Sequence, residues 1–215
     1  MPIITLLLLA VLAVVFGIEV LLSDPSDRLT PPLDVLLSLG ALQYMYVVRL
    51  GEWYRLLSAA FLHGDVIHFL VNGVALYLAG STLEPVVGPY LFLCFYFLGA
   101  LSGSVVSLLL NSHAIVSVGA SGAILALFAA ILILSFCVGD AEKRSGMRQD
   151  SVRILVTSLL PVAGANTDYA AHFGGLLAGA GLAVALLLKS PAGLRQLALA
   201  SDDGDRPRNS DPDRG

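Results

Sequence analysis

Two short motifs inside apolar stretches of the chain carry the side chains needed for nucleophilic catalysis. Gly119-Ala120-Ser121-Gly122 supplies a serine hydroxyl, and Ala171-His172-Phe173-Gly174-Gly175 supplies an imidazole. A serine hydroxyl is a weak nucleophile until a base removes its proton, and a neutral histidine within hydrogen-bond reach is such a base. Polar groups at membrane depth are costly and usually functional. The two motifs therefore predict a catalytic pair, with Ser121 as nucleophile and His172 as base.

Two further polar residues are candidates to stabilise the negative charge that develops in acyl transfer. His68 and Asn72 are four residues apart and share one face of a helix. Their side chains, with the backbone N–H of Ser121 near a helix start, are candidate donors to an oxyanion. The only acidic residue near the same depth is Asp168, at the edge of a span. The pattern thus favours a Ser–His dyad over a full triad.

Taken singly, each of these residues has an ordinary interpretation. A lone serine in a membrane helix usually bonds to its own backbone. His172 alone fits a proton relay or a metal ligand, and Asn72 alone fits an interhelical hydrogen bond. Their expected common depth favours the catalytic interpretation. Small residues that let two helices approach closely are Gly119, Gly122, Gly175 and Gly179.

Composition indicates an all-α, polytopic membrane protein. Of 215 residues, 57% are hydrophobic and only 13% are charged, against about 25% charged in soluble domains. The mean hydropathy is +0.84. Cys94 and Cys137 lie within apolar runs, so no disulfide framework is expected. The net charge of −4 argues against nucleic acid as a partner, and the sequence contains no recognisable metal or cofactor motif.

Six apolar segments predict a bundle of six transmembrane helices. They cover roughly residues 3–22, 64–82, 86–110, 114–138, 152–166 and 168–188. The first segment is interpreted as a retained span because it lacks a basic n-region and a cleavage site. Residues 1–200 are expected to form the membrane domain. Residues 201–215, rich in Asp, Arg, Pro and Gly, are expected to be disordered.

Basic residues predict how the bundle is oriented. The expected loop between the fourth and fifth segments carries Lys143, Arg144, Arg148 and, at its edge, Arg153, and the tail begins with Lys189 and Arg195. The basic residues place both, and with them the N-terminus, in the cytoplasm. The long 23–63 loop is then extracytoplasmic. His68, Asn72, Ser121 and His172 are expected at one depth on that side, with Ser121 roughly 10 Å below the surface.

Four motifs in a fixed order carry a family resemblance. They are Gly51-Glu52-Trp53-Tyr54-Arg55-Leu56-Leu57, the segment His63-x4-His68-x3-Asn72, and the two motifs that contain Ser121 and His172; Gly80 and Glu84 add a small and an acidic residue. Over roughly residues 51–188 the chain resembles the rhomboid family of intramembrane serine proteases. It departs from the family pattern at Tyr54, which lies between Trp53 and Arg55.

The resemblance implies a minimal six-span rhomboid that cuts transmembrane proteins in or near their membrane segment. It implies Ser121 and His172 as catalytic residues, His68 and Asn72 as oxyanion donors, and structural roles for Trp53, Arg55, His63 and Glu84. The chain is expected to be an integral membrane protein of a prokaryotic cell membrane. Two alternatives stay open: a non-catalytic relative that binds membrane clients, and a small transporter with a polar midplane.

Overall fold

The chain folds as a helical bundle with one short two-stranded sheet. The computed structural model describes residues 1–24, 29–137, 141–159 and 167–189. The longer helices are α1 (Ile3–Leu22), α4 (Val66–Val87), α5 (Pro89–Leu110), α6 (Ser121–Leu134), α7 (Ala141–Leu159) and α8 (Tyr169–Lys189). The shorter elements are α2 (Leu33–Leu39), α3 (Arg55–Ser58), the π-helix η1 (Met45–Arg49), the 3₁₀-helix η2 (Ala59–Phe61), and the strands β1 (Leu42–Gln43) and β2 (Val116–Ser117).

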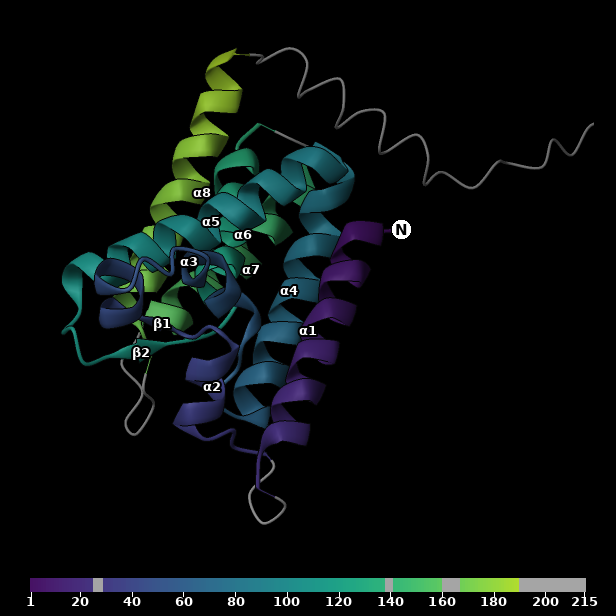
Figure 1. Cartoon of the computed structure of the whole chain (residues 1–215). Helices are drawn as coiled ribbons and strands as arrows, with labels where there is room; N and C mark the ends of the chain where they lie inside the picture. Colours follow the sequence, from purple (N-terminus) through teal and green to yellow (C-terminus); the bar gives the residue numbers. More distant parts are fainter. Residues whose placement is uncertain (25–28, 138–140, 160–166, 190–215) are drawn as a thin grey trace, which may run out of the picture.

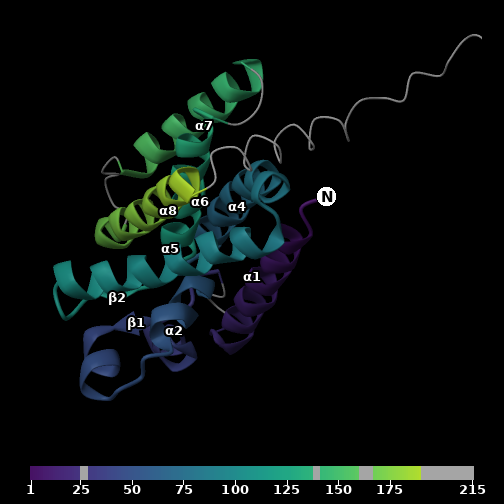
Figure 2. The same cartoon turned by 90° about the horizontal axis from the view of Figure 1, so that it is seen from above.

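Four of these helices are long and apolar enough to cross a membrane, namely α1, α4, α5 and α8. The chain is therefore an all-α membrane protein, as its composition predicts. The start of α1 and the end of α8 lie toward the same end of the bundle (Figure 1). Seen from above, α7 and α1 lie on opposite sides of the molecule, with α5, α6 and α8 between them (Figure 2).

The predicted fourth and fifth spans differ from the helices that form. Instead of covering 114–138, α6 begins only at Ser121, because residues 116 and 117 pair with β1 and Gly119 has a positive φ of 123°. Instead of a span over 152–166 preceded by a loop, the helix α7 covers 141–159 and starts in the polar, charged stretch. Among the described residues, neither helix meets the criterion for a span. Residues 160–166 and the predicted tail, 201–215, lie outside the described residues.

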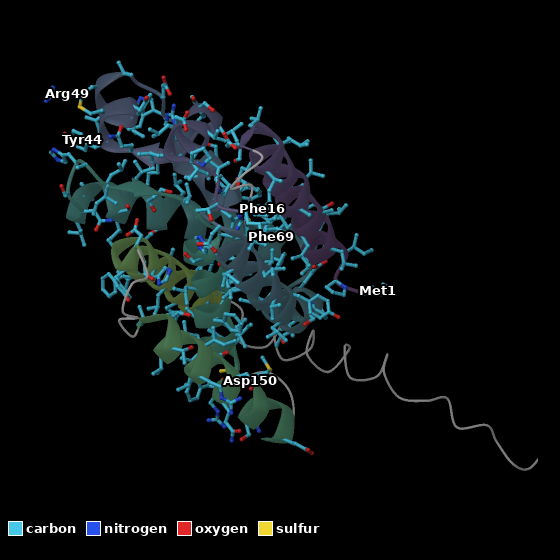
Figure 3. The ribbon with its side chains drawn as sticks, turned by 90° about the horizontal axis from the view of Figure 1, so that it is seen from below. Met1, Phe16, Tyr44, Arg49, Phe69 and Asp150 are labelled. Carbon is cyan, nitrogen blue, oxygen red and sulfur yellow. The ribbon has the colours of Figure 1, made fainter. Side chains whose placement is uncertain are left out.

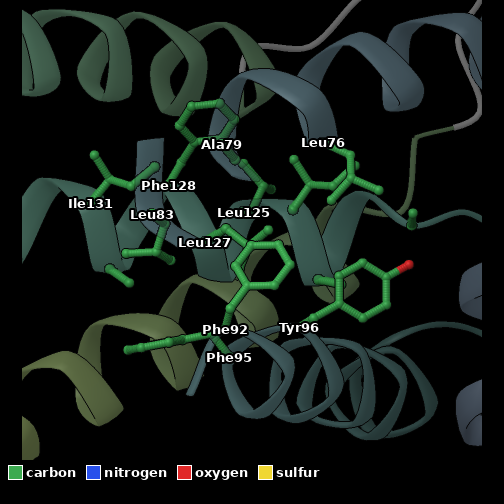
Figure 4. Close-up of a cluster of buried hydrophobic side chains, with 14 of the residues drawn as sticks. Leu76, Ala79, Leu83, Phe92, Phe95, Tyr96, Leu125, Leu127, Phe128 and Ile131 are labelled. Carbon is green, nitrogen blue, oxygen red and sulfur yellow. The ribbon is translucent and has the colours of Figure 1, made fainter. Parts of the chain in front are cut away.

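The core is built around α6, which is buried on nearly all sides. Every residue from 122 to 131 is buried. Three aromatic side chains of α5, Phe92, Phe95 and Tyr96, pack against leucines of α4 and the apolar side chains of α6 (Figure 4). A 14-residue helix is about 21 Å long and is too short to cross the hydrocarbon core. Because protein surrounds α6, its first residue lies inside the bundle rather than at a membrane surface.

Glycines bring the backbones of α6 and α8 into contact. A Cβ added at Gly175 would collide with the carbonyl of Gly122, and one added at Gly179 would collide with the carbonyl of Ala126. A third glycine, Gly103 of α5, faces the Ala171 carbonyl, 2.8 Å from where a Cβ would lie. This close packing fixes α8 against α6 at the level of Ser121.

A buried carboxylate joins α1 to α4 on the other side of the bundle. Glu84, in the last turns of α4, accepts hydrogen bonds from the backbone N–H groups of Ile4 and Thr5 at 2.9 Å and from the Thr5 hydroxyl at 2.7 Å. These N–H groups belong to the first turn of α1, which has no capping side chain of its own. Gly80 leaves room for Thr5. Glu84 thus caps α1 and closes the α1–α4 seam.

The predicted 23–63 loop is a folded segment, at least over residues 29–63. Arg55 organises it: its side chain is buried, pairs with Glu52 at 2.6 Å, and donates to the carbonyls of Leu37 and Ala41 at 2.8 and 2.9 Å. The guanidinium also lies over the ring of Tyr46, 4.1 Å from its centroid. Trp53, in contrast, is 60% exposed, so the structure gives it no packing role in this segment.

We expect Gly175→Ala to destabilise the protein by about 2 kcal/mol or more, because the added methyl forces the backbones of α6 and α8 apart. Thermal unfolding of the purified protein in detergent measures the effect. Gly181→Ala is the matched control in the same helix, since nothing lies within 4 Å of a Cβ there. Equal stability of the two variants would contradict the role assigned to the α6–α8 contact.

Candidate active site

Ser121 and His172, far apart in the sequence, meet in a hydrogen bond. The Nε2 atom of His172 lies 2.9 Å from Oγ of Ser121. Ser121 is the first residue of α6, and His172 lies in the first turn of α8. His172 is 7% exposed, while Ser121 is partly exposed. The contact therefore combines a sheltered base with a hydroxyl that a substrate can reach.

The second ring nitrogen of His172 is held by the helix α7. Its Nδ1 atom lies 2.9 Å from the carbonyl oxygen of Ser158. A carbonyl oxygen only accepts hydrogen bonds, so Nδ1 carries the proton. In the neutral ring, Nε2 is then unprotonated and accepts from the Ser121 hydroxyl. The Ser158 carbonyl thus sets the tautomer that a general base requires.

The start of α6 supplies hydrogen-bond donors beside the serine. Ala120 precedes the helix and offers no capping side chain. The first N–H groups of a helix have no acceptor within it and attract negative charge. The N–H of Ser121 is one of them. Because Gly119 turns the chain sharply into α6, these donors lie inside the bundle next to the Ser121 hydroxyl.

His68 and Asn72 of α4 lie against the same turn. A Cβ added at Gly119 would lie 2.7 Å from Cε1 and 2.8 Å from Nε2 of His68, and 3.6 Å from Nδ2 of Asn72. Both side chains thus pack against Gly119, which is two residues before Ser121. Within the described part of the chain, Nδ2 of Asn72 is buried without a hydrogen-bond partner. A buried amide without an acceptor is costly, which is a reason to expect a ligand there.

Asp168 is engaged in holding helices together and does not contact Nδ1 of His172. Its carboxylate accepts from the Ser107 hydroxyl at 2.5 Å, the Asn111 amide at 2.8 Å and the Ala171 backbone N–H at 2.9 Å. Burial acts to raise the pKa of Asp168, but these hydrogen bonds, with one from Ser117, hold the pKa below its ordinary value. The charged carboxylate therefore caps α8 and ties it to the end of α5.

His63 lies behind His68, and sequence reasoning missed its partner, Glu19. The fully buried Glu19 carboxylate accepts from the backbone N–H of His63, with its two oxygens at 3.2 and 3.3 Å. Burial, and then the neighbouring His68, lower the pKa of His63 to about 3, so its ring is neutral. The ring packs edge-on against His68, with centroids 5.3 Å apart. An acidic residue inside the apolar 3–22 segment was the signal that could have identified this contact.

A cavity of about 20 Å³ adjoins the turn that precedes Ser121. Its lining includes Gly119, Gly122 and Ala171, together with Ser104 and Ser117. This volume is enough for a single water molecule, and the two hydroxyls would give it polar partners.

The structure divides the predicted site residues into three sets and leaves Trp53 outside them. His68, Asn72, Gly119, Ser121 and His172 gather at one place, where a hydroxyl, a base and several donors could act on a carbonyl group. Gly122, Gly175 and Gly179 provide the close packing behind it. Arg55, His63 and Glu84 fasten other parts of the bundle, and Trp53 does neither. No group of three His, Cys, Asp or Glu side chains suited to a metal ion occurs among the described residues.

Comparison with known proteins agrees with the motifs. A family model for the rhomboid domain matches residues 50–189. The chain is 36% identical over 169 residues to RHOMBOID-like protein 5 of Arabidopsis thaliana, covering 77% of this chain and 54% of that protein. It is 30% identical over 157 residues to Rhomboid protease GluP of Bacillus subtilis (strain 168), covering 71% and 30%.

A further relative is RHOMBOID-like protein 6, mitochondrial, of Arabidopsis thaliana, which is 33% identical over 186 residues, covering 84% of this chain and 59% of that protein. The chain thus matches between about a third and three fifths of the length of these relatives.

We expect neutral His172 to carry its proton on Nδ1, because the Ser158 carbonyl accepts from that atom. The measurement is the ¹⁵N spectrum of histidine-labelled protein at about pH 8, above the ordinary histidine pKa of about 6.5. Subtracting the spectrum of His172→Ala isolates the signals of this ring from those of His63, His68 and His113. A ring protonated on Nε2 would contradict the geometry.

Proposed function

Because this chain belongs to the rhomboid family, we propose that it is an intramembrane serine endopeptidase that uses Ser121 and His172 as a dyad. The observation that carries the proposal is the 2.9 Å contact between His172 Nε2 and Ser121 Oγ. The names of its relatives, which include a rhomboid protease of Bacillus subtilis, support the same class of activity. The proposed substrates are transmembrane proteins, cut in or near their membrane segment.

In the proposed mechanism, His172 activates the serine. Ser121 Oγ attacks the scissile carbonyl carbon while His172 Nε2 accepts the hydroxyl proton. The imidazolium then gives this proton to the leaving amine, and the C–N bond breaks. A water molecule, deprotonated by the same nitrogen, hydrolyses the acyl–serine ester and regenerates the hydroxyl. Throughout, the Ser158 carbonyl keeps its hydrogen bond from Nδ1 and stabilises the charged ring.

We assign the oxyanion to the donors around Gly119. The candidates are the backbone N–H of Ser121 and the side chains of His68 and Asn72. The unpartnered Nδ2 of Asn72 supports this assignment, because a tetrahedral oxyanion is an acceptor that appears only during the reaction. Donors of this kind stabilise the transition state more than the ground state.

The test of the proposal is a fluorophosphonate probe followed by a cleavage assay with a transmembrane substrate. We expect the probe to label wild-type protein at Ser121, and Ser121→Ala to abolish both labelling and cleavage while the protein stays folded. His172→Ala should lose nearly as much, because members of one catalytic unit are not additive. Asn72→Ala should lower turnover by about 100- to 1,000-fold.

The matched control for these variants is Ser81→Ala. Ser81 lies in α4, and its hydroxyl bonds to the carbonyl of Leu78 in its own helix. Substantial cleavage by purified Ser121→Ala protein would rule out the proposed nucleophile. A folded wild-type protein that neither binds the probe nor cuts any substrate would instead support the non-catalytic, client-binding alternative.

We further propose that one end of the bundle, where α1 begins and α8 ends, faces the cytoplasm. Ser121 is then reached from the opposite side of the membrane. The basic residues of α7 support this orientation. A membrane-impermeant maleimide should label a cysteine placed at Asp34, but not one placed at Ser145, in intact cells expressing protein without Cys94 and Cys137. The reverse pattern would overturn the orientation.

A further inference from the structure

The helix α7 changes from polar to apolar along its length. The proposed catalysis does not explain this change. All its charged residues fall between 142 and 153, and none follows Arg153. The last part of the helix instead exposes Val156 and Leu159, which are 52% and 38% accessible. Arg148 and Arg153 therefore lie where the polar part of α7 gives way to its apolar part.

An open groove of about 430 Å³ lies at this transition. Its lining consists of Arg148, Gln149, Val152 and Arg153. Figure 3 shows α7, marked by Asp150, at the margin of the molecule and away from the segment that carries Tyr44 and Arg49. Two guanidinium groups offer fixed arrays of N–H donors that match phosphate oxygens. The groove is thus cationic, rich in donors and open to the surroundings.

The surroundings of the two arginines leave them available to an external anion. Among the described side chains, no carboxylate lies within ion-pair distance of Arg148 or Arg153. Arg148 lies over the ring of Phe136, 5.2 Å from its centroid, and this contact limits its movement. The exposed Asp150 follows Arg148 by two residues, which is about 200° around the helix. Asp150 also precedes Arg153 by three residues and is its neighbour on the helix surface, although the two side chains form no ion pair. Glu142 is exposed about 9 Å farther toward the start of α7 than Arg148.

The apolar residues next to the groove indicate what kind of anion fits. Arg148, Val152 and Val156 are spaced four residues apart, so they form one row along the helix. The row starts with a cation at Arg148 and ends about 12 Å farther along the helix at Val156, and its two valines are exposed. A phosphate joined to hydrocarbon chains matches this order of groups, whereas a free phosphate would use only the first.

We propose that Arg148 and Arg153 bind the phosphate of an anionic membrane phospholipid, whose chains lie along Val152 and Val156. The site lies in the part of α7 before Ser158, whose carbonyl contacts His172; Arg153 and Arg148 are about 7.5 and 15 Å along the helix from Ser158. It is independent of whether the protein is a protease, because binding is measured without any substrate.

The test is native mass spectrometry of the full chain in detergent, titrated with phosphatidylglycerol. Phosphatidylcholine with the same acyl chains is the neutral reference lipid. We expect wild type to retain phosphatidylglycerol in preference to phosphatidylcholine, and Arg148→Gln/Arg153→Gln to need roughly tenfold more phosphatidylglycerol for the same occupancy. Arg148→Lys/Arg153→Lys, which keeps both charges, should retain part of the preference. Inorganic phosphate at millimolar concentration should not displace the lipid.

The matched control is Arg49→Gln, which removes an exposed positive charge from η1, outside α7. It should bind phosphatidylglycerol as wild type does. Thermal unfolding of each variant shows that the comparison is made on folded protein. Unchanged lipid retention in the double glutamine variant, an equal loss in Arg49→Gln, or equal retention of the two lipids would overturn the proposal. Displacement of the lipid by inorganic phosphate would show a simple anion site instead.

Discussion

The backbone contact between α6 and α8 is the constraint on which the rest of the site depends. A hydrogen bond between Ser121 and His172 requires two helices to approach more closely than ordinary side chains allow. Gly175 and Gly179 meet the carbonyls of Gly122 and Ala126 directly. In a membrane the lipid tails are as apolar as the helices, so the hydrophobic effect does not bring helices together. Close packing is therefore a main source of helix association. The residues that hold the helices together therefore also set the distance between Ser121 and His172.

Three carboxylates inside the bundle fasten its helices through hydrogen bonds. Glu84 caps α1, Glu19 accepts from the backbone of His63, and Asp168 joins α8 to α5. A buried polar group without a partner is destabilising, so each of these contacts specifies one arrangement of its helices. Nδ2 of Asn72 is among the buried side-chain atoms of the described residues that have no hydrogen-bond partner, and it lies beside the turn that leads to Ser121.

The helix α7 connects the site to the outer part of the molecule. Its Ser158 carbonyl occupies the place that a carboxylate has in a Ser–His–Asp triad, since it accepts from Nδ1 of His172. A backbone carbonyl orients the ring without introducing a charge. The proposed dyad is consistent with this geometry: the main chain supplies the partner of Nδ1, and Asp168 caps α8.

The sequence by itself determined the class of the protein and the family, and it named the candidate site residues. Apolar segments of about 20 residues fixed α1, α4, α5 and α8, because hydrocarbon thickness sets their length. Motif spacing singled out Ser121, His172, His68 and Asn72. It could not show that α6 starts at Ser121, because the residues before it, Val116 and Ser117, pair with β1, which is distant in sequence. Nor could it assign Ser158 a role, since a backbone carbonyl leaves no trace in residue type. The α7 helix and the Glu19–His63 contact likewise depend on neighbours far along the chain, which only the tertiary structure brings together.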